Sequence, residues 1–455
     1  MVADADSLLH DPRHPMSGPR RSEPPETPSR PPQRRRAALA VAAALAVGGG
    51  VALAVVLVPG GEQPTPAPRQ PTATPTRQVS VPKRNPVQSP PWGFTGSGWQ
   101  DICYGPVATP GASRAPRVPD GRPCRPGSTR ITGSAQIGLT ARAGADTDRI
   151  EALWSSIEPL APSDAAARGV PRFNWTPVVN QYRTMIRDGI RPVVVAFGAP
   201  EWARAPGWNR HGGCEGCSFP PAPEHIGEWR AFLRGLITHL PRMSALEVWN
   251  EPNFRTFFAP HADPGLYARL LEAADGAARE AGFRGPIVTG GLSPALPGRG
   301  KMPPVRFLSR VYEIAGKGSF DGIGAHPYPR QPPWTAGMIA NLQQLRGVSE
   351  RFNDGSKPLW ITEVGIGGAK SGAGRFNVPL DQQGPVLASM YRAAQGMNVR
   401  SFLVYVLSDL SASPSRFATY GVTSPALRPK PAYCYLAQHV GHTRACPVPR
   451  LAPAP

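Results

Sequence analysis

Short apolar runs alternate with amphipathic stretches from Trp92 almost to the C-terminus, and this alternation limits the folds available to the chain. Eight of the runs have the length and residue types of strands, and they are too apolar to leave one face in water. They are Trp92–Thr95, Arg149–Trp154, Pro192–Phe197, Ala245–Trp249, Pro286–Gly290, Gly322–Ala325, Leu359–Thr362 and Phe402–Leu407. Eight such strands separated by helices predict an α/β fold, the closed (β/α)8 TIM barrel.

The stretches between these runs have the periodicity of amphipathic helices. Apolar residues fall on one face of Trp175–Arg187 and of Pro223–Leu240, and Ser134–Arg142 has a helical pattern as well. Asp263 followed by Pro264 predicts an N-cap and a first-turn proline for another helix. No glycine-rich dinucleotide fingerprint follows the first strand, which counts against an open doubly wound sheet.

The chain before the barrel has a different composition. Residues 1–36 are rich in Pro, Arg and Ser, which predicts a disordered tail. Ala37–Val58 is an uncharged apolar run of 22 residues, long enough to be a transmembrane helix. Arg34, Arg35 and Arg36 precede it and predict a cytoplasmic N-terminus with the rest of the protein outside. Residues 59–91 contain ten prolines and predict an extended linker.

These features predict a single-pass protein of the cell membrane with an extracytoplasmic barrel at residues 92–446 and a short tail at 447–455. A cleaved secretory signal is the alternative, and it would make the protein secreted. The long segment before the apolar run and the lack of a clear cleavage site argue against it.

All six cysteines follow the apolar run, and an even number on that side suits an oxidising compartment. Proximity along the chain favours three disulfides, Cys103–Cys124, Cys214–Cys217 and Cys434–Cys446. His211 with Cys214 and Cys217 could instead form a metal or redox site. Zinc prefers four ligands, however, and this stretch offers three. We therefore expect no metal.

The net charge of +19 is compatible with an anionic partner, such as a cell-surface polymer or a lipid headgroup. A coding bias toward arginine, alanine and proline is the simpler explanation of the charge. Nucleic acid is disfavoured as a partner, because the chain has no basic helix, no zinc-finger spacing and no aromatic-basic strand pair.

Two of the predicted strands end in a glutamate. Asn250, Glu251 and Pro252 follow the fourth strand, and Glu363 ends the seventh within Thr362-Glu363-Val364-Gly365. A carboxylate at the mouth of a buried strand is partly dehydrated, which raises its pKa and suits it to proton donation. Because barrel sites form at the carboxyl ends of strands, these two glutamates should meet there. Hydrolysis of a glycosidic bond uses such a pair of carboxyl groups.

The two glutamate motifs, in this order, resemble those of clan A glycoside hydrolases, and the likeness spans roughly residues 92–440. Features of families 39 and 5 recur within it. The resemblance implies a retaining enzyme on a (β/α)8 barrel, with no cofactor. It assigns the acid/base to the strand-four glutamate, Glu251, and the nucleophile to the strand-seven glutamate, Glu363. Both positions agree with the strand count above.

The same resemblance implies roles for residues around the two glutamates. Two insertions interrupt the alternation of strands and helices: one between Trp92 and Ser134–Arg142, which contains Cys103 and Cys124, and a second at Pro200–Pro223. The second follows the third strand directly and should lie on the same face as the two glutamates. Many clan members carry a tryptophan at the end of strand eight, where this chain has a tyrosine. The implied substrate-binding residues are Asn250, Arg149, His326, Tyr328, Trp202 and Tyr405.

The resemblance implies a glycosidase that cleaves O-glycosidic bonds of a poly- or oligosaccharide by double displacement, and the apolar run before the barrel predicts that it is anchored and faces outward. A cell-envelope transglycosylase is an alternative, since it would use the same covalent intermediate. A non-catalytic carbohydrate-binding barrel is a second alternative, which the presence of both glutamates disfavours.

Overall fold

The computed structural model describes residues 89–96, 102–104, 129–206, 217–369, 376–409, 418–444 and 446, and for 102–104 and 129–131 it describes the backbone alone. The expected disordered tail, transmembrane helix, C-terminal tail and nearly all of the linker lie outside these residues. Within the described residues, no helix combines the length and apolar character needed to cross a bilayer.

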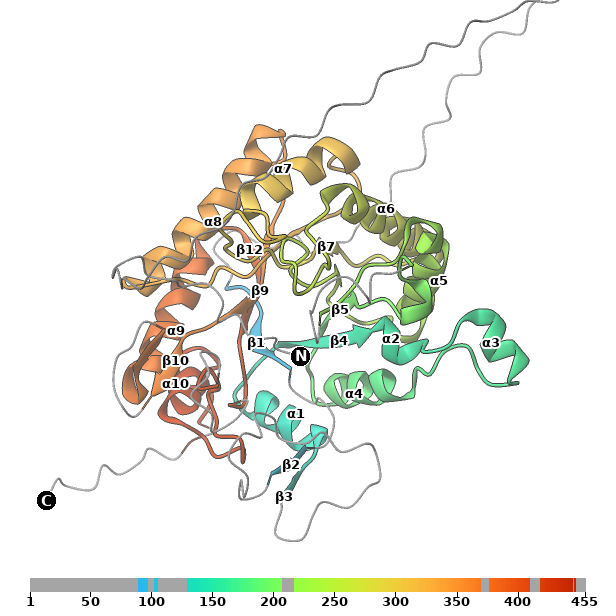
Figure 1. Cartoon of the computed structure of the whole chain (residues 1–455). Coiled ribbons are helices and arrows are strands. Elements are labelled where there is room, and N and C mark those ends of the chain that lie inside the picture. Colours follow the sequence, from blue (N-terminus) through green and yellow to red (C-terminus); the bar gives the residue numbers. More distant parts are fainter. Residues whose placement is uncertain are drawn as a thin grey trace, which may run out of the picture. The chain divides into compact units, whose positions relative to one another are not determined.

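Eight parallel strands form the centre of the fold (Figure 1). Neighbouring strands follow the order β7-β6-β5-β4-β1-β12-β9-β8. Bridges from Val288 to Gly322 and from Leu292 to Ala325 join β7 to β8 and close the cylinder. The predicted (β/α)8 barrel is therefore confirmed. Its strands are β1 Trp92–Thr95, β4 Thr147–Leu153, β5 Val193–Phe197, β6 Ala245–Val248, β7 Ile287–Thr289, β8 Ile323–Ala325, β9 Leu359–Val364 and β12 Val399–Val404.

The last barrel strand differs most from its predicted position. It begins at Val399, three residues before the predicted start at Phe402, and ends at Val404. Arg400 and Ser401 interrupt the apolar pattern, so the start of this strand resembles a loop in the sequence. Ser401 is nevertheless buried, since both faces of a parallel barrel strand are covered.

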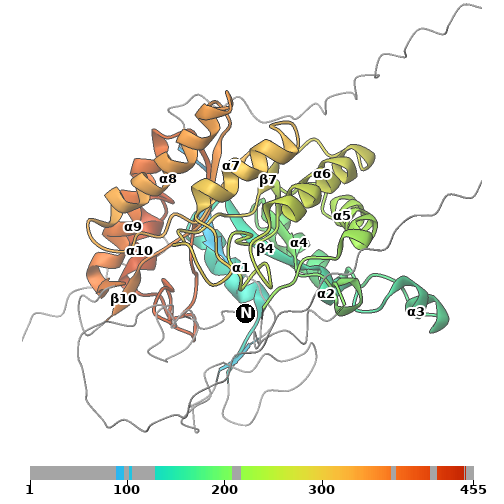
Figure 2. The same ribbon diagram turned by 45° about the horizontal axis from the view of Figure 1, so that its top comes forward.

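Helices cover the outside of the barrel, and Figures 1 and 2 both show α5, α6 and α7 side by side. The predicted cap is confirmed, because the Asp263 carboxylate accepts hydrogen bonds from Gly265 N and Leu266 N at the start of α6. The described helices are α1 Gly133–Arg142, α2 Trp154–Ile157, α3 Pro162–Ala167, α4 Thr176–Arg187, α5 Ile226–His239, α6 Pro264–Glu280, α7 Pro304–Ala315, α8 Trp334–Arg351, α9 Leu380–Gln395 and α10 Pro431–His439.

The connections contain smaller elements. In the first unit, an antiparallel pair of strands occupies the predicted insertion. A parallel pair follows β9. Two 3-10 turns lie in and after the second insertion. These elements are β2 Ile102–Tyr104, β3 Thr129–Ile131, β10 Gly367–Ala369, β11 Asn377–Pro379, η2 Glu201–Ala203 and η3 Pro223–His225.

One of the three predicted disulfides, Cys434–Cys446, is confirmed. Cys217 is also disulfide-bonded, but its predicted partner Cys214 lies outside the described residues. The Cys103–Cys124 pairing stays a prediction, since neither side chain is described.

A cluster of buried aromatic rings packs beside β5 and β6. Trp154 stacks on Phe232 with ring centroids 5.7 Å apart, and Trp229 meets Trp249 at 5.7 Å. All four side chains are inaccessible to solvent. Fully burying a large apolar side chain contributes about 1.5–3 kcal/mol, so this cluster holds β6 firmly at the point where the Asn250-Glu251 segment begins.

Candidate active site

Glu251 and Glu363 meet at the carboxyl end of the barrel, as the sequence predicts. Glu251 follows β6 by three residues, and Glu363 is the fifth residue of β9. One carboxylate oxygen of each, together with a ring nitrogen of His326, lies within 4.8 Å of the others. Retaining glycosidases place their carboxyl groups about 5–5.5 Å apart and inverting enzymes about 6.5–9.5 Å apart. The two oxygens here lie within 4.8 Å, which is nearer to the retaining spacing than to the inverting one.

An unusual backbone turn directs Glu251 toward the centre of the barrel. Trp249 and Glu251 have φ angles of 74° and 40°, in the left-handed region that residues other than glycine rarely adopt. Packing holds this turn in place. The Trp249 backbone N donates to Ala196 O at 2.8 Å, and its buried indole Nε1 donates to Phe257 O at 2.6 Å. Residues other than glycine with left-handed backbone angles cluster at functional sites, so this conformation agrees with a functional role for Glu251.

Arg149 connects the two strands that lead to Glu251 and Glu363. Its Nη1 donates to Glu363 Oε1 at 2.7 Å, its Nη2 to Asn250 Oδ1 at 2.8 Å and its Nε to Glu247 Oε2 at 2.6 Å. Burial alone lowers the pKa of this guanidinium, but the Glu247 and Glu363 carboxylates outweigh burial and raise that pKa. Arg149 therefore stays charged beside the candidate nucleophile.

Glu247 is a site residue that the sequence analysis missed. It is fully buried, and its Oε1 accepts hydrogen bonds from Gly291 N at 2.8 Å and from Thr362 Oγ1 at 2.9 Å. A buried carboxylate is costly unless it is paired. A single acid within the apolar strand Leu246-Glu247-Val248 was therefore a signal that a cation would lie opposite it.

His326 lies between the two glutamates. Its Nδ1 is 2.8 Å from Glu251 Oε1 and 3.6 Å from Glu363 Oε2, and its Nε2 is 3.1 Å from Thr362 Oγ1. Thr362 donates its hydroxyl proton to Glu247, so its oxygen must accept from Nε2–H. The proton of neutral His326 therefore sits on Nε2. Burial lowers the pKa of this ring, but Glu363 and Glu251 outweigh burial and raise it.

Tyr328 donates a hydrogen bond from its hydroxyl to Glu363 Oε2 at 2.9 Å. Burial and the Glu363 charge raise the pKa of this phenol well above its usual value, so it remains a donor. Burial raises the pKa of Glu363 itself, while His326 and Arg149 act in the opposite direction. Glu363 thus accepts hydrogen bonds at both oxygens, and these favour its ionised form.

Two predicted aromatic residues have different surroundings. The Tyr405 ring lies 6.2 Å from Tyr328 and 6.4 Å from Tyr420, beside the glutamates. Tyr420 extends this group and was not among the predicted site residues. Trp202 instead packs on Trp154, with centroids 5.7 Å apart, and donates from Nε1 to Glu158 O at 3.2 Å. Among the described contacts, none links Trp202 to Glu251 or Glu363.

Glu251, His326 and Glu363 are groups of the kind that bind metal ions. The Arg149 guanidinium lies 2.7 Å from Glu363, however, and its fixed positive charge opposes a second cation. The arrangement suits carboxylate chemistry better than metal binding.

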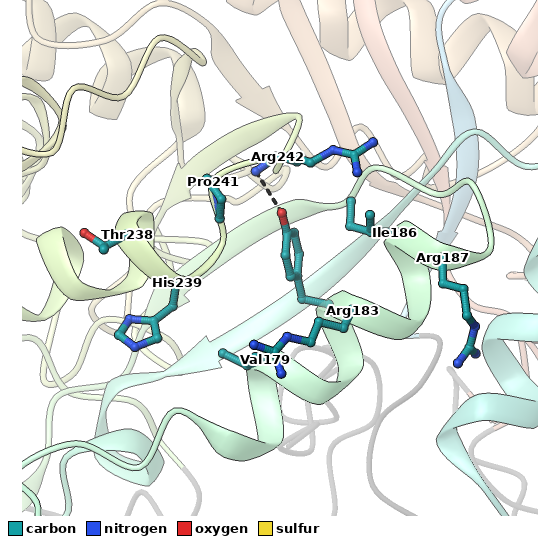
Figure 3. A pocket seen from close by; sticks show the side chains of 9 residues that line it. Val179, Arg183, Ile186, Arg187, Thr238, His239, Pro241 and Arg242 are labelled. Carbon is teal, nitrogen blue, oxygen red and sulfur yellow. Dashed lines mark hydrogen bonds between the residues drawn. The ribbon is translucent and has the colours of Figure 1, made fainter.

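A separate cavity of about 560 Å³ lies between α4 and the segment that follows α5 (Figure 3). Ile186, Arg187, Pro241 and Arg242 line it near the connections that lead into β5 and β6. It therefore lies at the amino end of the barrel, away from the glutamates. The Tyr182 hydroxyl accepts a hydrogen bond from Arg242 N at 2.8 Å across this cavity.

No family model matches the chain, and no curated protein sequence matches it. Among solved structures, the chain is similar to a family 39 glycoside hydrolase from the gut symbiont Bacteroides cellulosilyticus WH2. The TM-score is 0.53 and the identity 20%, over 79% of this chain and 65% of that one. A monomeric β-xylosidase from Caulobacter crescentus CB15 matches with a TM-score of 0.51 and 17% identity, over 67% of this chain and 64% of that one.

A GH5_18 protein from Streptomyces cattleya, solved in complex with GlcNAc, matches with a TM-score of 0.50 and 17% identity, over 70% of this chain and 76% of that one. The chain spans slightly less than two thirds of the length of the family 39 hydrolase and the β-xylosidase. At such identities the likeness shows the fold alone. The chain has the (β/α)8 barrel fold of the family 39 and family 5 glycoside hydrolases.

Proposed function

We propose that the protein is a retaining glycosidase in which Glu363 is the nucleophile and Glu251 the general acid/base. One observation carries the proposal. Two carboxylates from distant parts of the chain lie within 4.8 Å at the carboxyl end of a closed barrel, and each has its own hydrogen-bond partners. Two partly buried carboxylates this close repel one another, which makes the pair unfavourable for stability alone.

In the first step, Glu363 attacks the anomeric carbon while Glu251 gives its proton to the leaving oxygen. This forms a covalent glycosyl-enzyme. Hydrogen bonds from Arg149 and Tyr328 hold the two oxygens of Glu363 and set the direction of attack. The charge of Arg149 lowers the pKa of Glu363 and so partly offsets burial, which raises that pKa.

In the second step, Glu251 takes a proton from water, and the water oxygen displaces Glu363 from the anomeric carbon. Glu251 must therefore exist in both protonation states, and His326 can partner either one. Neutral His326 accepts the proton of Glu251 at Nδ1, while charged His326 donates from Nδ1 to the Glu251 carboxylate. The Nε2–H bond to Thr362 holds the ring in place throughout.

Asn250 contributes to sugar binding. Its Oδ1 accepts from Arg149 Nη2, so the side-chain NH2 is the part of Asn250 that can donate to a sugar. A donor next to Glu251 suits the 2-hydroxyl of the sugar bound to Glu363, and such contacts strengthen in the transition state.

The proposed substrate is a poly- or oligosaccharide outside the cell membrane, with Ala37–Val58 as the anchor. The sequence of that run and the arginines before it support this location. The Cys434–Cys446 disulfide also supports it, since disulfides persist mainly in oxidising compartments.

The test is hydrolysis of a broad panel of aryl glycosides and oligosaccharides by the full-length chain. Glu251→Gln and Glu363→Gln are compared with Glu313→Gln, an exposed glutamate on α7. We expect both site variants to lose sugar release while melting normally, and the control to retain it. Full activity in either site variant, or binding without turnover by the unaltered chain, would overturn the proposal.

A further inference from the structure

We propose that a basic cluster on the rim beside Glu251 binds an anionic group, a carboxylate or a sulfate or phosphate ester, on the leaving-group side of the glycan. This inference rests on the proposed function for the position of the scissile bond. It adds a substrate class that the two glutamates alone do not specify.

Three loops at the carboxyl end of the barrel supply the cluster. Arg255 follows β6, Arg299 and Lys301 follow β7, and Arg330 follows β8. Because all three strands end at the same rim, their loops converge there. We call these four residues the rim cluster.

Contacts between the loops bring the rim cluster next to Glu251. Phe254 N donates to Glu251 O at 2.9 Å, so Phe254 is one turn from the acid/base. Lys301 Nζ lies 5.3 Å from the centroid of the Phe254 ring. A side chain at Gly300 would meet Arg255, which places Arg255 against the same loop. Arg330 Nη2 donates to Pro294 O at 3.3 Å and ties the third loop to the second.

The positive charge of these loops is not matched by acids within them. Residues 249–263, 290–303 and 326–333 contain two acids, Glu251 and Asp263, and Asp263 caps α6. Arg299 and Arg330 are exposed, and Lys301 is half-buried. Ion pairs are found elsewhere in the described residues, as between Arg230 and Glu280, but none involves Arg299, Lys301 or Arg330.

The charges of the rim cluster affect one another. Burial, Arg299 and Arg330 all lower the pKa of Lys301, as expected of like charges held close together. A bound anion would remove this repulsion, and the field of several cations would raise the local concentration of anionic chains. The rim cluster is therefore suited to a negatively charged ligand.

The position of Glu251 decides which part of the glycan meets the cluster. Glu251 protonates the leaving oxygen, so the leaving group lies on its side of the cleft. The rim cluster continues from Glu251 through Phe254 and Lys301. The anionic group therefore belongs to the unit released in the first step, and the sugar that Glu363 attacks need not be charged.

The test measures binding to the full-length chain by calorimetry, with paired probes that differ in charge. Oligogalacturonate is compared with its methyl ester, and dextran sulfate with dextran. The Gln variant of Arg299, Lys301 and Arg330 together is compared with a control that carries Arg183→Gln, Arg187→Gln and Arg242→Gln. The control removes the same charge from exposed positions of the cavity in Figure 3, at the other end of the barrel.

We expect the charged member of at least one pair to bind more tightly than its neutral partner, with affinity that falls as salt rises. The rim variant should lose roughly tenfold in affinity for that probe, while the control changes little. The probe that responds distinguishes a carboxylate from a sulfate ester.

Equal binding of charged and neutral probes would overturn the proposal, and so would equal losses in the rim variant and the control. Failure of the proposed function gives a different result. In that case the charged probe binds through the rim cluster, but no glycan on the hydrolysis panel is cleaved.

Discussion

The two ends of strand β9 both carry buried charge, but they use it differently. At the amino end, Lys357 Nζ donates to Lys317 O and Phe320 O, each at 2.8 Å, and pairs with Asp354 at 2.7 Å. At the carboxyl end, Glu363 is held by two donors but faces a second carboxylate within 4.8 Å. The first arrangement surrounds one cation with an acid and two carbonyl oxygens, while the second places two groups of like charge opposite one another.

Burial of a charge is therefore not a sufficient mark of a functional site. The pKa of Lys357 is lowered by burial, and that of Glu363 is raised by burial, so both groups are perturbed. What separates them is the like charge opposite Glu363 and its position at the mouth of the barrel, where the side chain keeps 12% of its exposure. The following predictions test this contrast.

The largest effect is expected for Glu363→Gln. Loss of the nucleophile should lower kcat by about a thousandfold or more, because no covalent intermediate can form. The melting temperature should not fall, since the raised pKa of Glu363 shows that its ionised form is disfavoured in the folded protein. Steady-state rates measure kcat, and thermal melts measure the melting temperature. A lower melting temperature with intact kcat would mean that Glu363 stabilises the fold and does not take part in catalysis.

Arg149→Lys should have the next largest effect. Lysine retains the charge but cannot bond Glu247, Asn250 and Glu363 at once, as the guanidinium does. The resulting misplacement of Glu363 should lower kcat about a hundredfold. The measurement is kcat on the best substrate of the panel, and an unchanged value would mean that Arg149 serves the fold alone.

Tyr328→Phe should lower kcat roughly tenfold, because one hydrogen bond to a charged oxygen is lost. It should also change the pH profile. Glu363 must be ionised to attack, and burial raises its pKa above the usual 4.5, so the acid limb of kcat/KM lies at higher pH than for an ordinary glutamate. Removing the Tyr328 donor raises that pKa further and shifts the limb upward. If the acid limb of the pH profile does not move, Tyr328 does not lower the pKa of Glu363.

Lys357→Met should have the smallest effect on activity, within about twofold, because it acts at the opposite end of the barrel. It should lower the free energy of unfolding by about 3 kcal/mol, since it leaves the Asp354 carboxylate without its cation. Urea unfolding measures this loss, with Lys317→Met as a control at the same end. A large fall in kcat without loss of stability would contradict the contrast between the two ends.

The sequence predicted the barrel well, because parallel strands covered on both faces are continuous apolar runs bounded by helical patterns. It also predicted the meeting of Glu251 and Glu363, since carboxyl ends of parallel strands share one rim. The late start of the predicted eighth strand shows the limit of this approach. Arg400 and Ser401 look like loop residues until tertiary packing covers them.

Parts of the site depend on contacts that strand periodicity does not reveal. Glu247 sits inside a strand, and its partner Arg149 lies 98 residues away in sequence. Tyr420 enters the group of tyrosines from a loop after the last barrel strand. Tryptophan is a residue type expected to stack on a sugar ring. The Trp202 ring instead packs against the rings of Trp154 and His225. Residue type and position along the chain do not decide between packing and binding in such cases.

The most direct test of the account is to trap the covalent intermediate. The full-length chain is incubated with a panel of activated 2-deoxy-2-fluoro glycosides, and the labelled peptide is identified by mass spectrometry. The account predicts one sugar attached to Glu363, with no label in the Glu363→Gln variant. A label on another residue, or hydrolysis with inversion at the anomeric carbon and no adduct, would contradict it.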